Sequence, residues 1–240
     1  MTFVDTLAFQ LFTLAFVSGL LFYSGLVGYA TYRKFGPRRT LEHLKAQAVP
    51  LGGVGVIVFS IGLWGELVWP LPGSYNILFF DPYVLLGAVL IGFAVCASTG
   101  RRTQYVGFLA AMTGVLSIYY GSYAKYLALT KEPTAMFLLY VALGLTAVFT
   151  FPVTLWIDRM VLDPLSMGTS AEGPTGASPS APVAAGQVAA GWMSGNVPVT
   201  TQTKVLFAGF LLFLLFAAGS AIAALIVGGG ALPSHLTYAP

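Results

Sequence analysis

The sequence VLFAGFLLFLLFAAGSAIAALIVG, residues 205–228, contains no charged or amide side chain. A helix rises about 1.5 Å per residue, so about 20 apolar residues are enough to cross a hydrocarbon core of roughly 30 Å. The stretch also lacks the alternation of apolar and polar residues that a strand of a membrane barrel requires. It therefore predicts a transmembrane α-helix.

The remaining chain has the same character. Of its 240 residues 57% are hydrophobic and 8% are charged, whereas ordinary soluble domains carry roughly 25% charged residues. Because lipid offers no hydrogen-bond partner to the backbone, each apolar run is expected to be helical. We therefore predict an all-α, polytopic transmembrane bundle of about six spans. The predicted spans are residues 7–31, 48–69, 82–99, 104–127, 133–157 and 205–228.

Three regions differ in composition. Residues 1–160 hold the first five predicted spans and are expected to form a five-helix core. Residues 161–203 are rich in Ala, Gly, Ser and Pro, a composition that favours a flexible cytoplasmic linker. Residues 204–240 contain the last span and a short outer tail. Because that span is apolar on every side, we expect it to be appended to the core with a lipid-facing surface.

The basic residues alternate from loop to loop. Nine of the eleven Lys and Arg residues fall on one side of the predicted bundle, and the positive-inside rule makes that side cytoplasmic. Both termini are therefore expected outside the cell membrane, with the 158–204 segment in the cytoplasm. The nine residues are Arg33, Lys34, Arg38, Arg39, Lys45, Arg101, Arg102, Arg159 and Lys204.

Small residues are frequent in the first two predicted spans. Small residues four positions apart let membrane helices approach closely. They indicate packing within the chain or, as the alternative, a docking face for another subunit. The candidate packing positions are Gly19, Ser24, Gly25, Gly28, Gly52, Gly55 and Gly62.

Charged and phenolic side chains occur together near the predicted outer ends of the helices. Glu66 and Lys125 lie at similar depths by residue count, and opposite charges at that depth gain by pairing. We therefore expect a Glu66–Lys125 ion pair within an outer polar layer. The alternative is that these residues are interfacial anchors, because Tyr and Lys concentrate at the headgroup level. The candidate layer is Glu66, Asp81, Tyr119, Tyr123, Tyr126 and Lys125.

Motifs for metal or cofactor chemistry are missing from the sequence. Cys96 is the only cysteine. The two histidines, His43 and His235, fall outside the predicted spans on opposite sides of the membrane, so they cannot both be axial ligands of one haem. There is no catalytic or metal site to nominate. No cofactor is expected, although a bound membrane lipid is compatible with the composition. Nucleic acid is not an expected partner, because the net charge of +3 is small and scattered.

Three strings resemble a known family: GELVWPLPGSYNILFFDP at 65–82, QYVGFLAAMTGVLSIYYGSYAKYLALT at 104–130 and FPVTLWIDRM at 151–160. They are similar to a family of uncharacterised archaeal membrane proteins known as a domain of unknown function. The likeness covers residues 1–160. It implies an archaeal source and hence a membrane of tetraether lipids, and it carries over no catalytic residue.

Three classes of function follow from these features. The leading hypothesis is an accessory, non-catalytic subunit of a larger membrane complex, most plausibly a respiratory or other energy-converting one, with other membrane subunits and lipids as partners. It fits the small-residue faces, the extra apolar helix and the absence of ligand motifs. The alternatives are a transporter or channel with an outward polar vestibule and a membrane enzyme that acts on lipid head groups.

Overall fold

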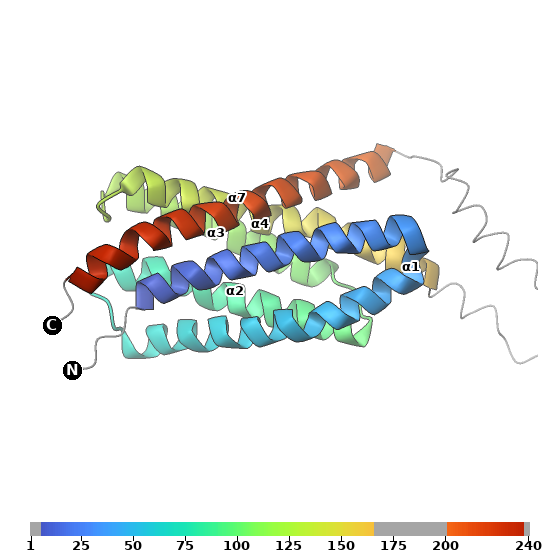
Figure 1. Ribbon diagram of the computed structural model, residues 1–240, viewed down its shortest axis with the longest axis horizontal. Helices are drawn as coiled ribbons and strands as arrows, with labels where there is room; N and C mark the ends of the chain where they lie inside the picture. Colours follow the sequence, from blue (N-terminus) through green and yellow to red (C-terminus); the bar gives the residue numbers. More distant parts are fainter. Residues whose placement is uncertain (1–5, 166–200, 238–240) are drawn as a thin grey trace, which may run out of the picture.

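The computed structural model describes residues 6–165 and 201–237, and all regular structure in those two ranges is helical. The elements are α1 (Thr6–Val68), α2 (Ser74–Thr99), α3 (Gln104–Tyr126), α4 (Pro133–Ile157), a π-helical turn (Asp158–Leu162) and α7 (Thr201–Thr237). The helices run along the long axis of a single bundle (Figure 1). The prediction of an all-α fold is therefore confirmed for the described residues.

Helix α1 reverses its direction at Gly36. This residue has φ 79° and ψ −171°, a backbone conformation that glycine adopts without the steric cost a Cβ would bring. Pro37 follows, and proline suits the first turn of the second arm because its missing N–H has no partner there in any case. Figure 1 shows the two arms, residues 6–35 and 37–68, lying side by side.

The loop that we expected at residues 32–47 is therefore almost entirely helical. Its basic side chains lie on the ends of two helical arms, close to the turn at Gly36. The charge pattern suggested a loop because helix ends beyond the hydrocarbon core are as polar as a loop. What makes the turn short is the dipeptide Gly36-Pro37, which reverses the chain without further residues.

Small residues set the distances between helices. A Cβ built on Gly62 would lie 2.6 Å from the Cα atom of Val84, and one on Gly55 would lie 2.9 Å from the Cβ atom of Leu90. The second arm of α1 therefore packs against α2 at backbone distance. In the same way, a Cβ on Gly114 of α3 would lie 2.9 Å from the backbone nitrogen of Val148 in α4. Close approach of this kind is typical of membrane helices.

Helix α7 is built into the bundle on one side, while Val205, Leu215 and Ile226 remain exposed on the other. Ala217, Ser220 and Ala224 are fully buried, and the Ser220 hydroxyl lies 2.9 Å from that of Thr146 in α4. Gly209 meets the Pro152 ring, where a Cβ would come within 2.8 Å. A helix without charges can face lipid on one side and protein on the other, so composition could not reveal the buried stripe.

Four helices of the described chain are long and apolar enough to cross a membrane: Leu7–Val68, Ser74–Thr99, Pro133–Leu165 and Lys204–Gly230. Helix α3 is not among them, and α1 enters as one stretch of 62 residues. The four helices are compatible with a membrane protein, but this count does not support six spans. The helical stretch that begins with α4 at Pro133 continues through the π-helical turn to Leu165, beyond the expected start of the linker at residue 161. Residues 166–200 of the expected linker lie outside the described ranges.

Candidate functional site

The predicted outer polar layer lies at the end of the bundle where α1 begins and α2 begins. There the Tyr120 hydroxyl donates a 2.7 Å hydrogen bond to Asp81 Oδ2, and the Glu66 carboxyl faces that of Asp81. Glu66 comes from the second arm of α1, Asp81 from α2 and Tyr120 from α3. Two carboxyl groups and a phenol thus converge from three helices, and we call these three residues the acid cluster.

The expected Glu66–Lys125 ion pair is wrong. Lys125 Nζ lies 5.0 Å from the centre of the Phe137 ring, and no ion pair joins it to Glu66 in the residues described. Lys125 and Tyr120 occupy different faces of α3. At 3.6 residues per turn, a separation of five residues rotates the side chain by about 140° beyond one full turn. Equal depth along the bundle therefore did not bring Glu66 and Lys125 together.

The remaining predicted tyrosines face outward. Tyr119, Tyr123 and Tyr126 are 55%, 52% and 84% exposed, and the Tyr119 and Tyr123 rings are 5.1 Å apart. Tyr120 was the residue that the sequence hypothesis left out. A signal for it exists, because Tyr120 lies three residues after Ser117 and four before Ala124, which both belong to the buried small-residue stripe of α3.

The loop at residues 69–73 is held by one buried amide. Asn76 is fully buried, its Nδ2 donates to the Gly65 carbonyl at 3.0 Å, and its Oδ1 accepts from the Leu71 N–H at 3.3 Å. The Tyr75 hydroxyl donates to the Leu129 carbonyl of the α3–α4 turn. These bonds give the segment the geometry of a tight connector. The bonds also tie together the loops at this end.

At the other end, the π-helical turn presents a buried carboxylate to α3. Asp158 is 2% exposed; its Oδ1 accepts from the Thr103 N–H at 2.8 Å and its Oδ2 from the Gln104 N–H at 2.9 Å. The carboxylate thus satisfies N–H groups that the first turn of α3 leaves without intrahelical partners. We did not predict this cap, since Asp158 lies 55 residues away in sequence.

An elongated cavity runs through the interior of the bundle. Its volume is about 150 Å³, and its lining includes side chains from all five α-helices. Along the first arm of α1 it extends from Gln10 to Tyr29, a distance of roughly 28 Å at the rise of an α-helix. Because so small a volume is spread over such a length, the cavity is narrow.

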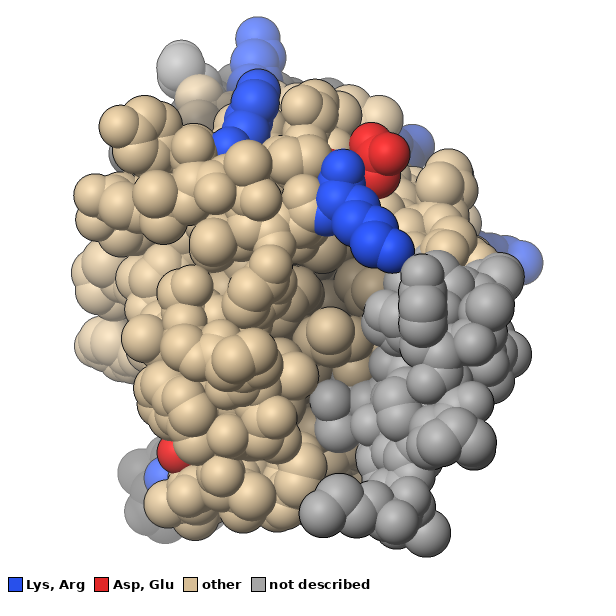
Figure 2. All heavy atoms as spheres, turned by 90° about the vertical axis from the view of Figure 1, so that its left-hand side faces the viewer, with Lys and Arg blue, Asp and Glu red and all other residues tan. Residues whose placement is uncertain are grey.

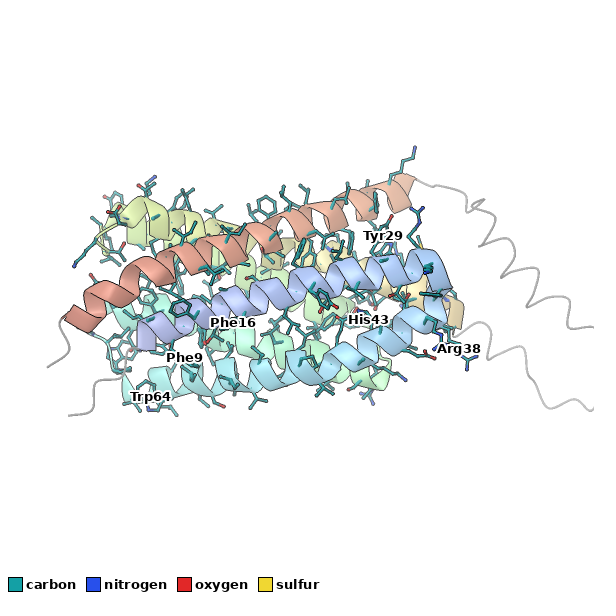
Figure 3. The ribbon with its side chains drawn as sticks, in the orientation of Figure 1. Phe9, Phe16, Tyr29, Arg38, His43 and Trp64 are labelled. Atoms are coloured by element: carbon teal, nitrogen blue, oxygen red, sulfur yellow. The ribbon has the colours of Figure 1, made fainter. Side chains whose placement is uncertain are left out.

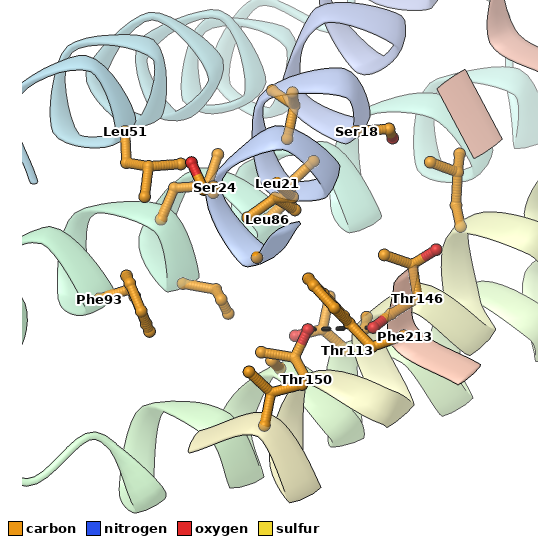
Figure 4. A pocket seen from close by; sticks show the side chains of 18 of the residues that line it. Ser18, Leu21, Ser24, Leu51, Leu86, Phe93, Thr113, Thr146, Thr150 and Phe213 are labelled. Atoms are coloured by element: carbon orange, nitrogen blue, oxygen red, sulfur yellow. Dashed lines mark hydrogen bonds between the residues drawn. The ribbon is translucent and has the colours of Figure 1, made fainter. Parts of the chain in front are cut away.

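The lining is apolar with scattered neutral polar groups. Figure 4 shows Leu21, Leu86 and Phe213 turned into the cavity, with Ser18 and Ser24 on one side and threonines on the other. The threonine hydroxyls bond to their own helices, as when Thr150 Oγ1 donates to the Thr146 carbonyl at 3.0 Å. No charged side chain of the described residues lines the cavity. Water and ions therefore find few partners inside.

Four polar side chains of the lining have a buried atom without a hydrogen-bond partner among the described residues: Gln10 Nε2, Ser24 Oγ, Gln47 Nε2 and Tyr83 Oη. Their residues are only 2%, 7%, 8% and 3% exposed. Burying a polar group without a partner is unfavourable. These four atoms could form hydrogen bonds with a molecule in the cavity, and Gln10, Gln47 and Tyr83 were not nominated from the sequence.

The candidate packing residues have separate surroundings. A Cβ on Gly25 would lie 3.0 Å from Leu214, one on Gly28 3.8 Å from His43, and one on Gly52 3.1 Å from Ala94. Gly55 and Gly62 meet α2, as described above. Ser24 lines the cavity. Gly19 has open space around it, with no described atom within 4 Å of a built Cβ.

These features define a class of protein: in its described residues it is an all-helical bundle of apolar helices, compatible with a membrane protein, with an interior cavity that no charged side chain lines. The chain belongs to the family described as Protein of unknown function (DUF981), which matches residues 1–167. No curated protein and no solved structure matches it. The family match ends at residue 167, so α7 lies beyond it although α7 forms part of the cavity wall.

Proposed function

We propose that this protein crosses a membrane six times and binds an elongated, apolar molecule inside its bundle, without catalysing a reaction. The observation that carries the proposal is the cavity: it is long and narrow, lacks charged lining residues and holds buried polar atoms without partners. Cavities between helices of a bundle are common sites for small molecules. An alkyl or isoprenoid chain has the shape and the polarity that this cavity would accept.

Six crossings are supported by the geometry of α1 and α3. Each arm of α1 has about 30 residues, enough for one crossing. Helix α3 turns its large side chains outward, for example Tyr105, Phe108 and Val115 at 75%, 55% and 54% exposure. Its buried stripe consists of small residues, namely Gly107, Ala110, Thr113, Gly114, Ser117, Gly121 and Ala124. Large apolar residues outside and small ones inside suit a helix whose solvent is lipid.

The orientation proposed from the basic residues agrees with the arrangement of the helix ends. The turn at Gly36, the α2–α3 connection, the end of α4 and the start of α7 meet at one end of the bundle, where Figure 3 labels Arg38. We propose that this end faces the cytoplasm. The opposite end, seen in Figure 2, carries few charged atoms on the visible face. An archaeal source, implied by the family resemblance, remains a prediction.

The experiment compares molecules that co-purify with two variants. Leu21 lines the cavity, so Leu21→Trp should fill it and reduce the bound apolar molecule to a small fraction. Leu26, on the same arm and 46% exposed, supplies the control Leu26→Trp. Native mass spectrometry of the protein in gentle detergent measures the bound mass. Equal occupancy in both variants would contradict the proposal, as would a wild-type protein that carries nothing and takes up no added lipid.

A second candidate function is the accessory subunit of a respiratory or other energy-converting membrane complex. The observation that favours it is Gly19, which has open space around it beside the exposed ring of Phe16. A small residue that packs against nothing in the described part of its chain leaves room for a neighbouring helix. Co-purification of redox subunits from native membranes would support this role. Its loss in Gly19→Leu but not in Gly53→Leu would assign the docking face to the first arm of α1, because Gly53 is equally open and lies on the second arm.

The transporter and enzyme alternatives have less support. Among the residues that the structure describes, the cavity lining offers no charged side chain to an ion or a polar solute. The acid cluster brings two carboxyl groups and a phenol together, yet Glu66, Asp81 and Tyr120 do not line the cavity. A lipid-headgroup enzyme would need those groups beside a bound substrate.

A further inference from the structure

Two of the partnerless polar atoms lie at the same depth of the bundle. Ser24 precedes Gly36 by 12 residues on the first arm of α1, and Gln47 follows Gly36 by 11 residues on the second arm. Because the arms run antiparallel with equal rise, the two side chains occupy one layer. Both line the cavity, and both are more than nine-tenths buried.

A third polar atom belongs to the same part of the hairpin. His43 Nε2 is buried and lacks a hydrogen-bond partner among the residues described. His43 lies four residues before Gln47 and so shares its face of the second arm. It is opposite Gly28, where a Cβ would lie 3.8 Å from His43 Cδ2, and Gly28 lies four residues after Ser24. The hairpin therefore holds a polar layer made of Ser24, Gln47 and His43, seen in Figure 3 for His43.

The chemistry of this layer selects a neutral head group. A serine hydroxyl and a glutamine amide each donate and accept hydrogen bonds, which matches a hydroxyl or a carbonyl group. A charged head group would lie in the bundle interior without a counter-charge, because no charged side chain lines the cavity in the described residues.

The cavity beyond this layer suits a chain. From Ser24 toward Gln10 it continues for 14 residues of α1, or roughly 21 Å. The side chains along this path are mainly aliphatic, and they include Leu11, Leu14, Val17, Leu21 and Leu86. Tyr83, clustered with Val17, adds one buried hydroxyl without a partner among the described residues.

We propose that Ser24 and Gln47 bind the neutral hydroxyl or carbonyl head group of a long-chain molecule, whose chain lies in the cavity toward Gln10. The inference rests on the proposed function, since it assigns polarity and direction to the molecule in the same cavity. Gln10, at the far end, contacts the tail region and does not select the head.

The test uses the full chain in detergent and two probes that differ only in the head: a long-chain primary alcohol and the alkane of equal length. Native mass spectrometry measures the ratio of the two probes bound in direct competition. Wild-type protein should prefer the alcohol about tenfold, as two hydrogen bonds would allow. The paired variant Ser24→Ala with Gln47→Leu should lose this preference and still bind the alkane, which also shows that the variant is folded.

Gln10→Leu is the matched control, because it removes the same amide at the other end of the cavity and should keep the preference. A second variant, Gln47→Asn, shortens the amide without making the site apolar and should reduce the preference partially. The inference is overturned if the paired variant keeps the tenfold preference, if Gln10→Leu loses it equally, or if wild-type protein binds both probes equally. Binding of neither probe to wild-type protein would instead overturn the proposed function.

Discussion

Helices α3 and α7 contribute to the bundle in opposite ways. Helix α3 is the less apolar in sequence, yet its fully buried residues are all small and most of its large side chains are presented outward. Helix α7 is apolar throughout, yet it buries Phe210 and Phe213 together with Ala217, Ser220 and Ala224. The hydropathy of a helix indicates whether the helix can lie in lipid, whereas the size of its residues indicates which of its faces packs against protein. Four predictions test this comparison.

The largest effect is expected at the contact between α3 and α4. Gly114→Leu would force a side chain into the backbone of α4, where a Cβ already comes within 2.9 Å of the Val148 nitrogen. Since neither backbone can yield, we expect a loss of about 3 kcal/mol or more. Thermal unfolding in detergent measures it. Gly219→Leu on α7 is the control, because a Cβ there meets nothing within 4 Å; equal melting temperatures of the two variants would contradict the prediction.

The start of α3 provides the second test. Asp158→Ala removes the carboxylate that accepts the Thr103 and Gln104 N–H groups, and we expect a loss of about 1–3 kcal/mol because buried donors are left without partners. Asp158→Asn keeps one acceptor oxygen and should lose less. The exposed Arg39–Glu42 pair is the reference, and Glu42→Gln should cost about 0–1 kcal/mol. The contrast would fail if Asp158→Ala unfolded at the wild-type temperature.

The third test concerns the hydrogen bond between α4 and α7. Thr146 and Ser220 hydroxyls lie 2.9 Å apart and are buried, so Thr146→Val and Ser220→Ala should be coupled. Hydrogen bonds between membrane helices average about 0.6 kcal/mol in double-mutant cycles, and we expect a coupling of that order. A cycle of four proteins, unfolded in the same detergent, gives the value. Zero coupling would mean that α7 is held by packing alone.

The smallest effect is expected on the outward face of α3. Tyr119→Phe and Tyr126→Phe remove hydroxyls from exposed rings and should change stability by no more than about 0.5 kcal/mol. Tyr120→Phe, which deletes the hydrogen bond to Asp81, should cost about 1 kcal/mol. The same unfolding assay separates the two classes. If Tyr120→Phe cost less stability than Tyr119→Phe and Tyr126→Phe, the assignment of Tyr120 to the interior face of α3 would be wrong.

Several errors of the sequence hypotheses share one cause. Depth along a helix can be counted from residue numbers, so Glu66 and Asp81 were expected at one end of the bundle, where they lie. The angular position of a side chain depends on which face its helix turns inward, so Lys125 was paired with the wrong residue and Tyr120 was left out. The partnerless atoms of Gln10, Ser24 and Gln47 depend on what surrounds them in three dimensions.

The sequence alone determined that the described chain is helical and built of apolar segments, because long runs without charges leave the backbone no other way to satisfy its hydrogen bonds in lipid. It also determined which ends of those segments carry the basic residues. The tertiary structure decided that α1 reverses within Gly36-Pro37, that α7 closes the bundle, and that a narrow cavity runs between the helices. These features depend on packing between distant residues, and in a uniformly apolar sequence hydropathy does not distinguish a face that meets lipid from one that meets protein.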